Sequence, residues 1–296
     1  MEIKKLLFVT QFEELWFDAL NSLMDLRKAG FNHVVFIHVI ERDKVAMRRG
    51  KGYLKDEEIK LKEIANVRFI DWAEALYEQG IEVGAYMVVG DLIPKVISAA
   101  REEGVDLIVT GQHKRGKIEE LYSGSETLEL LRRTSTPVLV YKYLLPSGKV
   151  NDRPFERPLF ATDWSHASEM TVKYMIGLKE IIHKIEVIHV ANEKSFKGVS
   201  AMEVQKTRKE SRQKLEEVCE LFRAEGIDAT EHLYVGDVAE QINRAARERG
   251  SSMIVAGTTG RGPWKERWLG SVTRKLAEQS EIPVLLIPAQ IETGGN

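Results

Sequence analysis

The sequence has very little that would cross-link the chain or hold it in a membrane. Cys219 is the only cysteine among 296 residues, so no disulfide can form within the chain, and this favours a reducing, cytoplasmic environment. No uncharged stretch approaches the ~20 apolar residues of a membrane span, and the first residues lead into a strand pattern rather than a signal peptide. The formal net charge of −2 gives no reason to expect nucleic acid or an anionic membrane as a partner.

Internal repetition is the clearest organising feature. Residues 103–111 match residues 249–257, and shorter stretches at 89–91, 124–125 and 137–140 recur at the same offset of 146 residues. Matches in one register over this length indicate two copies of a whole domain rather than a solenoid unit. The chain length agrees, since about 150 residues are typical of one domain. We expect a first domain over 1–143, a linker rich in proline and charge over 144–157, and a second domain over 158–290.

Hydrophobic periodicity predicts an α/β fold. Short, apolar, β-branched runs predict strands over 5–10, 33–40, 83–89, 105–111 and 137–141, and again over 158–162, 184–190, 228–235, 252–257 and 283–287. Amphipathic stretches between them predict helices over 12–19, 57–79, 91–103 and 124–133, and over 166–181, 201–225, 237–249 and 271–280. This alternation predicts two tandem Rossmann-like domains, each a five-stranded parallel sheet with helices on both faces.

A glycine-rich loop separates the fourth strand and the last helix of the second domain. Gly257 and Gly260 follow the apolar run 252–256, and Gly270 and Ser271 come directly before the predicted helix. Glycines let backbone N–H groups approach a phosphate closely, and a helix N-terminus adds unpaired donors and a partial positive charge. The loop therefore predicts an anion site, although glycines also close tight turns and Ser271 could instead cap the helix.

The second domain resembles the universal stress protein family, in a tandem form with two such domains in one chain. The resemblance rests on Thr162 and Asp163 at the end of the first strand, His189 and Val190 at the end of the second, and the motif Gly-x2-Gly-x9-Gly-Ser/Thr. It implies that Asp163 and Val190 hold the adenosine end of an adenine nucleotide. It further implies that Gly257 lies against the ribose, and that the phosphates, bridged by Mg²⁺, are surrounded by Gly260, Gly270, Ser271, Val272 and Thr273.

The first domain departs from this motif. Gln11 stands where the second domain has Asp163, and Lys114 replaces the second glycine of the loop. We expect a degenerate domain that mainly pairs with its neighbour, with a retained but altered site as the alternative. By analogy with the family, the last strands, 137–141 and 283–287, would pair the two halves, and two chains could associate as a homodimer.

Several smaller signals allow a structural interpretation. We interpret Ser165 as the N-cap of the next helix, and Asp91 and Asp237 as N-caps rather than ribose ligands. His38 and His189 fit a packing or hydrogen-bonding role. We expect Cys219 to be a core residue rather than a reactive thiol.

A second set of motifs does not indicate a catalytic site. Residues 111–117 fit the start of a P-loop, but Ile118 occupies the position of the Mg²⁺-binding Ser or Thr. No metal-ligand spacing and no catalytic constellation stands out. The sequence therefore predicts a regulatory stress-response protein that binds ATP, ADP or AMP and acts on an unidentified protein partner. An enzyme that hydrolyses ATP slowly and a nucleotide-free scaffold remain the alternatives.

Overall fold

The computed structural model describes residues 2–10, 16–46, 52–111, 123–145, 147–192, 198, 200–259 and 269–291. The first half contains β1 (Lys5–Val9), α1 (Trp16–Asn21), η1 (Met24–Ala29), β2 (His33–Ile40), η2 (Arg42–Lys44), α2 (Lys55–Tyr77), β3 (Glu82–Val89), α3 (Leu92–Glu103), β4 (Leu107–Gly111), α5 (Ser123–Arg133) and β5 (Val138–Tyr141). The second half contains β6 (Pro158–Ala161), α6 (His166–Ile176), β7 (Lys184–Asn192), α7 (Ala201–Ala224), β8 (Asp228–Gly236), α8 (Val238–Arg249), β9 (Met253–Gly257), α9 (Ser271–Gln279) and β10 (Val284–Ile287).

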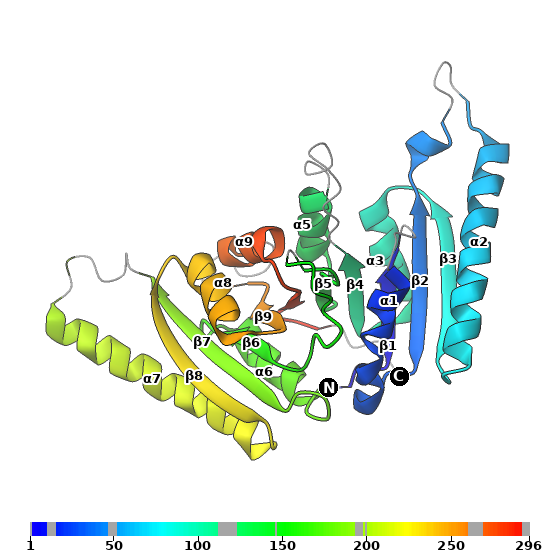
Figure 1. The fold of residues 1–296 in the computed structure, drawn as a ribbon. Coiled ribbons are helices and arrows are strands. Elements are labelled where there is room, and N and C mark those ends of the chain that lie inside the picture. The colour runs from blue at the N-terminus through cyan, green and yellow to red at the C-terminus, as the bar shows by residue number, and fades with distance from the viewer. Residues whose placement is uncertain are drawn as a thin grey trace.

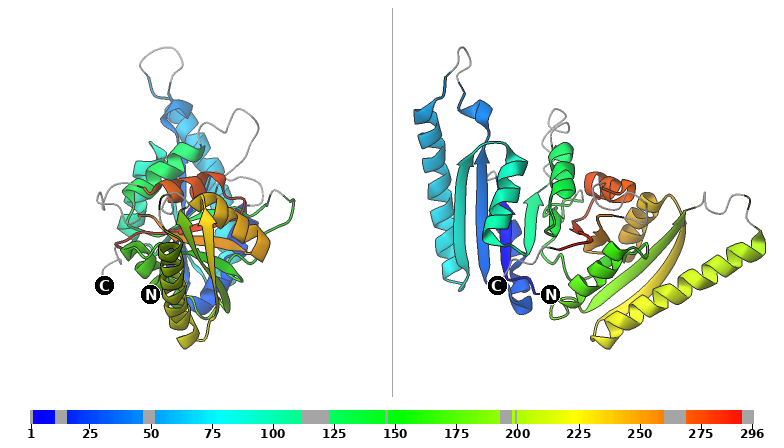
Figure 2. Two further views of the ribbon diagram at one scale, coloured as in Figure 1. Left: turned by 90° about the vertical axis from the view of Figure 1, so that its left-hand side faces the viewer. Right: turned by 180° about the vertical axis from the view of Figure 1, so that it is seen from behind.

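All these strands form one sheet in the order β3-β2-β1-β4-β5-β10-β9-β6-β7-β8. Neighbouring strands within each half are parallel, which confirms the predicted α/β class. The two halves meet at β5 and β10, which pair antiparallel with Leu139 opposite Leu285. The expected pairing of the halves through their last strands is therefore confirmed, and it merges two sheets into one. The long helices α2 and α7 lie beside the outer strands at opposite ends of this sheet (Figures 1 and 2).

The inner strands are buried on both faces because their apolar residues face alternate sides. Leu6 and Phe8 of β1 belong to one core cluster with α1, α2, α6 and α7, whereas Leu7 and Val9 belong to the other with α3, α5, α8 and α9. Helices thus cover both faces of the sheet, as the sequence predicts. Within the described ranges, no helix has both the length and the apolar character needed to cross a bilayer.

Two helices differ from their predicted bounds by more than two residues at one end. Of the helix predicted over 12–19, residues 12–15 lie outside the described ranges, and α1 begins at Trp16. Helix α6 ends at Ile176 instead of continuing to 181. Gly177 follows at the C-cap, and glycine is a weak helix former because its backbone loses the most freedom on ordering.

The segment predicted as the linker is held by hydrogen bonds from both halves. Tyr141 of β5 donates its hydroxyl proton to the carbonyl of Asn151 at 2.7 Å. The Asn151 side-chain amide in turn donates to the carbonyl of Ser252 at 2.8 Å, and Ser252 donates its own hydroxyl proton to Pro154 at 2.8 Å. Asn151 is buried, so these contacts fix the segment against the sheet junction.

Candidate functional site

The end of β6 is fastened to the end of its neighbour β7. The Thr162 N–H donates to the carbonyl of Ile188 at 2.9 Å, and the Thr162 carbonyl lies 2.8 Å from His189 Nδ1. Because a carbonyl only accepts, the imidazole carries its proton on Nδ1 in this contact. The first half repeats the arrangement, with His38 Nδ1 3.0 Å from the Thr10 carbonyl. The hydrogen-bonding role predicted for both histidines is confirmed.

The short connection from β6 to α6 is held by side-chain hydrogen bonds to its own backbone. Asp163 Oδ1 accepts from the Ser165 N–H at 3.0 Å and from the Ser168 hydroxyl at 2.9 Å. Ser165 is the N-cap of α6 and accepts from the Ser168 N–H, which confirms its predicted role. Ser165 Oγ also donates to the carbonyl of Thr259 at 3.3 Å, so the same cap fixes the first residues after β9.

Trp164 occupies a strained position in this connection. Its φ of 62° makes it the one residue other than glycine with a left-handed backbone in the described part of the chain. That conformation costs a non-glycine residue roughly 1–2 kcal/mol. The indole packs over the His189 ring at a centroid distance of 4.6 Å, so packing offsets the strain and braces the loop that carries Asp163. Sequence reasoning missed Trp164, and no local propensity marks it.

Gly257, at the end of β9, is required by the close approach of α6. A Cβ at this position would lie 2.6 Å from Ala167 Cβ and 3.1 Å from the Ala167 carbonyl carbon. The missing side chain therefore serves helix packing, although the residue also lines the cavity described below. This gives Gly257 a structural role that its predicted contact with a ribose does not include.

The start of α9 faces the same space without a side-chain cap. Gly270 is the N-cap, with φ −60° and ψ 145°, and offers no capping oxygen. The alternative in which Ser271 caps the helix is therefore wrong, because Ser271 is already the first helical residue. Thr273 is buried and donates its hydroxyl proton to the Gly257 carbonyl at 3.0 Å, which ties α9 to β9. The amide donors of the first helical turn have no intrahelical acceptor.

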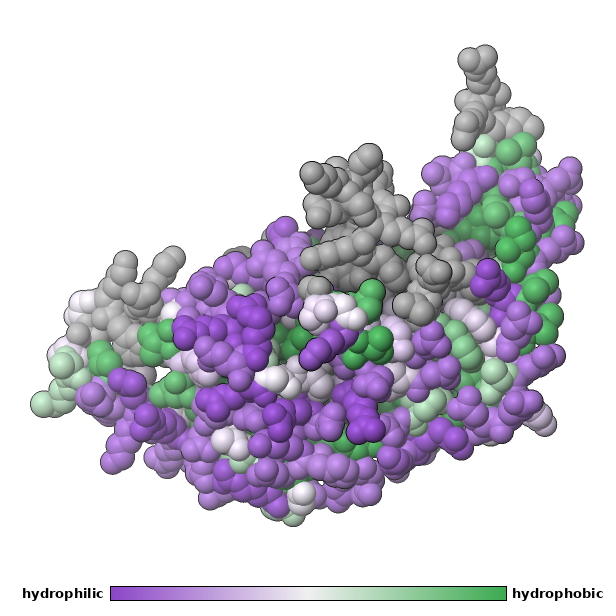
Figure 3. Space-filling model, in the orientation of Figure 1, coloured by the Kyte–Doolittle hydropathy of each residue, from purple (hydrophilic) through white to green (hydrophobic). Residues whose placement is uncertain are grey.

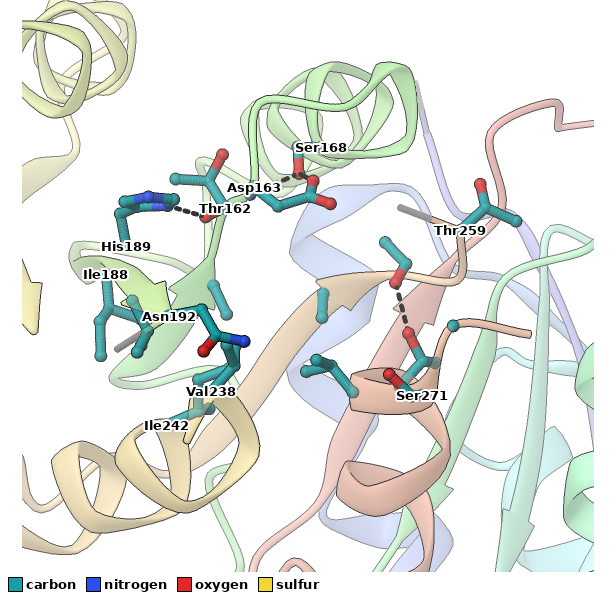
Figure 4. Close-up of a pocket in the computed structure, with 17 residues that line it drawn as sticks. Thr162, Asp163, Ser168, Ile188, His189, Asn192, Val238, Ile242, Thr259 and Ser271 are labelled. Carbon is teal, nitrogen blue, oxygen red and sulfur yellow. Dashed lines mark hydrogen bonds between the residues drawn. The ribbon is translucent and has the colours of Figure 1, made fainter. Parts of the chain in front are cut away.

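These segments enclose a cavity of about 480 Å³ at the carboxyl ends of β6, β7 and β9. It is lined by Ala161, Thr162, Asp163, Ser168, Ile188, His189, Val190, Asn192, Val238, Ile242, Ala256, Gly257, Thr259, Gly270, Ser271, Val272 and Thr273. Figure 4 shows Asp163 and Ser168 on one side, Val238 and Ile242 of α8 on another, and Ser271 at the start of α9. Its volume lies within the range of small-molecule and cofactor sites, roughly 300–1,000 Å³.

The cavity brings together the predicted site residues that the structure describes. Thr162, Asp163, Val190, Gly257, Gly270, Ser271, Val272 and Thr273 all line it. Gly260 lies outside the described residues. Sequence reasoning missed Ser168, Asn192, Val238 and Ile242, since α8 and the far end of β7 reach the site only through the topology of the sheet.

A salt bridge joins the two helices beside the cavity. Asp237 caps α8 by accepting from the Glu240 N–H at 3.2 Å, and Lys275 of α9 lies 3.0 Å from its other oxygen. The Lys275 ammonium, with help from the backbone donors, lowers the pKa of Asp237. The N-cap prediction is confirmed for Asp237. Asp91 occupies the equivalent position of α3, but its side chain makes no capping hydrogen bond.

The matching region of the first half differs at the helix start. Helix α5 begins at Ser123, so Gly124 is a helical residue rather than an N-cap. Glu126 lies in the first turn, where the repeat places Val272 in α9. Burial, and then the charges of Glu41 and Glu129, raise the pKa of Glu126. Gln11 and Lys114, on which the predicted degeneracy rests, lie outside the described residues.

Two further observations concern metal binding and thiol reactivity. Within the described ranges, no three His, Cys, Asp or Glu side chains are grouped so as to hold a metal ion. Cys219 is fully buried in the core, and desolvation raises the pKa of its thiol to about 12. The interpretation of Cys219 as a core residue is confirmed.

Comparison with known proteins gives the same family for both halves of the chain. The sequence model of the universal stress protein family matches residues 2–142 and 154–288. Universal stress protein MJ0577 of Methanocaldococcus jannaschii is 29% identical over 153 residues, which are 47% of this chain and 94% of that protein. Universal stress protein YxiE of Bacillus subtilis is 30% identical over 146 residues, 45% of this chain and 99% of that protein. A universal stress protein structure from Archaeoglobus fulgidus shares the fold over 97% of both chains, with a TM-score of 0.71 at 22% identity.

Proposed function

The chain belongs to the universal stress protein family, and we propose that its second half binds an adenine nucleotide (ATP, ADP or AMP) to regulate a stress response. The observation that carries the proposal is the cavity of about 480 Å³ between Asp163 and the glycine-capped start of α9. One end of this cavity is apolar and the other offers amide donors. An adenine nucleotide has the same division into base and phosphates.

The base end would lie between β7 and α8. Ile188, Val190 and Ile242 line this part of the cavity with aliphatic side chains that suit the faces of a purine ring. Asp163 stands at its rim, and Ser165 and Ser168 hold its Oδ1 in place. A carboxylate oriented in this way would accept hydrogen bonds from the nucleoside.

The phosphate end would lie at the start of α9. Ser271, Val272 and Thr273 supply the first amides of this helix, and the helix dipole adds a partial positive charge. The Ser271 side chain is exposed and can donate from its hydroxyl. Thr273 can contribute only its amide as a donor, because its hydroxyl proton is engaged with Gly257. Mg²⁺ that accompanies the phosphates would neutralise part of their charge.

We further propose that the first half does not bind nucleotide. Glu126 places a carboxylate in the first turn of α5, where phosphates would otherwise meet a helix start. Glu41, which adds to the raised pKa of Glu126, extends the region of negative charge. An anionic ligand would be repelled there, so the main task of this half is to pair with the second half through β5.

Regulation would follow if nucleotide favours one arrangement of the helices around the cavity. The ligand would contact the α6 loop, α8 and α9 together, and α9 packs against α5 across the sheet junction. A ligand that binds one arrangement more tightly shifts the population towards it. A partner protein or a second copy of the chain that recognises this arrangement would then sense the nucleotide.

Val272→Glu tests the proposal, with Val272→Gln as the matched control. The glutamate copies Glu126 and brings negative charge to the start of α9, whereas glutamine has the same size without the charge. We expect AMP and Mg-ATP to raise the Tm of nucleotide-stripped wild-type protein and of the glutamine variant, but not of the glutamate variant. No Tm shift in wild-type protein would favour the scaffold. Steady phosphate release that Val272→Glu abolishes would favour the slow ATP-hydrolysing enzyme.

A further inference from the structure

A second, polar cavity lies at the outer edge of the sheet, away from the proposed nucleotide site. Its volume is about 310 Å³, and it is lined by Arg212 and Leu215 of α7, by Glu231, His232, Leu233 and Tyr234 of β8, and by Arg249 at the end of α8. No strand covers β8 on this side among the described residues, because β8 is the last strand of the sheet order. The surface over α7 is mostly hydrophilic, whereas hydrophobic residues gather over α2 at the opposite end (Figure 3).

Two arginines in the lining of this cavity form no ion pair within the part of the chain that the structure describes. Neither the Arg212 nor the Arg249 guanidinium has an ion-pair or hydrogen-bond partner there. The nearby carboxylates have other partners, and one of them, Glu248, accepts from the Tyr234 hydroxyl at 3.5 Å. Glu231 lies 3.6 Å from Arg223, and Glu186 lies 2.7 Å from His232 Nε2. Arg212 and Arg249 thus line the cavity without a direct ion-pair partner, and Glu231, which pairs with Arg223, is the carboxylate among the lining residues.

In the first half, the position equivalent to Arg249 carries a carboxylate that has partners within the chain. Tyr86 occupies the position of His232, since Tyr86 pairs with Ile37 of β2 and His232 pairs with Ile188 of β7. The Tyr86 hydroxyl donates to Glu103 at 2.6 Å, and Lys5 lies 3.1 Å from the other oxygen of Glu103.

The repeat places Arg249 where the first half has Glu103, so the charge at this position is reversed. In the second half the carboxylate beside His232 comes instead from Glu186 of β7, 2.7 Å from His232 Nε2, so Arg249 takes no part in that ion pair. An anion from solution would give the Arg249 guanidinium an ion-pair partner.

We propose that this cavity binds a small, multiply charged anion that carries carboxylate or phosphate groups. Guanidinium groups match both kinds of group through paired, charge-assisted hydrogen bonds. Tyr234 and His232 add polar groups to the lining, and Leu215 and Leu233 add apolar surface. The site lies at the β8 edge and shares no lining residue with the cavity that contains Asp163.

The test uses citrate and pyrophosphate as probes in calorimetric titrations of the full chain at low ionic strength. The Val272→Glu background removes competition from the start of α9. Arg249→Gln and Arg212→Gln should each weaken probe binding by about tenfold, since each removes charge-assisted hydrogen bonds. Arg249→Glu, which restores the carboxylate of the first half, should abolish binding. Arg208→Gln, one turn earlier on α7 and outside the cavity, is the matched control and should leave binding unchanged.

Three outcomes would overturn the proposal: no binding of either probe at millimolar concentration, equal weakening by Arg208→Gln and Arg249→Gln, or unchanged affinity in Arg249→Glu. Binding of citrate alone would identify the ligand as a carboxylate, and binding of pyrophosphate alone would identify it as a phosphate. Nucleotide titrations of Arg249→Gln without the Val272→Glu change should match wild-type protein. Failure at the β8 edge can thus be separated from failure of the proposed nucleotide site.

Discussion

Gly257→Ala should destabilise the protein because it drives β9 against α6. The new Cβ would lie 2.6 Å from Ala167 Cβ. Carbon atoms in good contact are about 3.5–4.0 Å apart, so α6 would have to move by roughly 1 Å. Such overpacking costs about 1–3 kcal/mol, while the lower chain entropy of the unfolded alanine variant returns only ~0.4–1 kcal/mol. We expect a net loss of about 1–2 kcal/mol in the free energy of unfolding.

Thermal unfolding and nucleotide titration measure the consequences. A loss of this size lowers the Tm by ~2–4 °C for each kcal/mol in a chain of this order of size. Affinity for AMP should also fall, because the moving end of α6 carries Ser168, which holds Asp163. The double variant Gly257→Ala/Ala167→Gly removes the closest clash and should recover part of both losses. A Gly257→Ala variant that unfolds at the wild-type Tm would refute the predicted clash. A double variant that is no more stable than Gly257→Ala alone would refute it as well.

Three further predictions follow from single contacts. Thr273→Val removes the hydrogen bond to Gly257 and should lower the free energy of unfolding by about 1 kcal/mol in urea titrations, and an unchanged midpoint would contradict this. Lys275 lowers the pKa of Asp237, so this pair stabilises the fold above the ordinary Asp value of 3.8 and the contribution disappears as the pH falls through the lowered pKa. Asp237→Asn should therefore flatten the acid side of the stability curve slightly, since half-exposed pairs contribute little, and a curve that matches wild type would argue against the contact. Cys219, with a buried thiol of pKa about 12, should resist iodoacetamide at about pH 8 until denaturant is added, and rapid labelling of native protein would refute its burial.

The fold could be predicted largely from sequence because its inner strands are short and buried on both faces. The apolar runs that contain Leu6 and Phe8, or Met253 and Val255, have no polar face, and helical stretches follow them at regular spacing. The carboxyl ends of parallel strands meet at one edge of a sheet, so Thr162, Asp163 and the glycine loop were expected to lie together. The site residues that the structure describes do line one cavity.

Other features depend on contacts that no local pattern encodes. The left-handed backbone of Trp164 is held by packing on His189, and propensity gives no sign of it. The role of Gly257 depends on a distance to Ala167, which is remote in sequence. The motif comparison of the first half rested on Gln11 and Lys114. It therefore overlooked Glu126, whose environment depends on how α5 lies relative to β2.

Nucleotide stoichiometry tests the central claim most directly. The protein would be stripped of bound nucleotide and titrated calorimetrically with AMP and, separately, with Mg-ATP. Our account predicts one nucleotide per chain, with binding lost in Val272→Glu and retained in Val272→Gln. Two nucleotides per chain would contradict the assignment of the first half as a domain without a site. No binding of either nucleotide would contradict the proposed function itself.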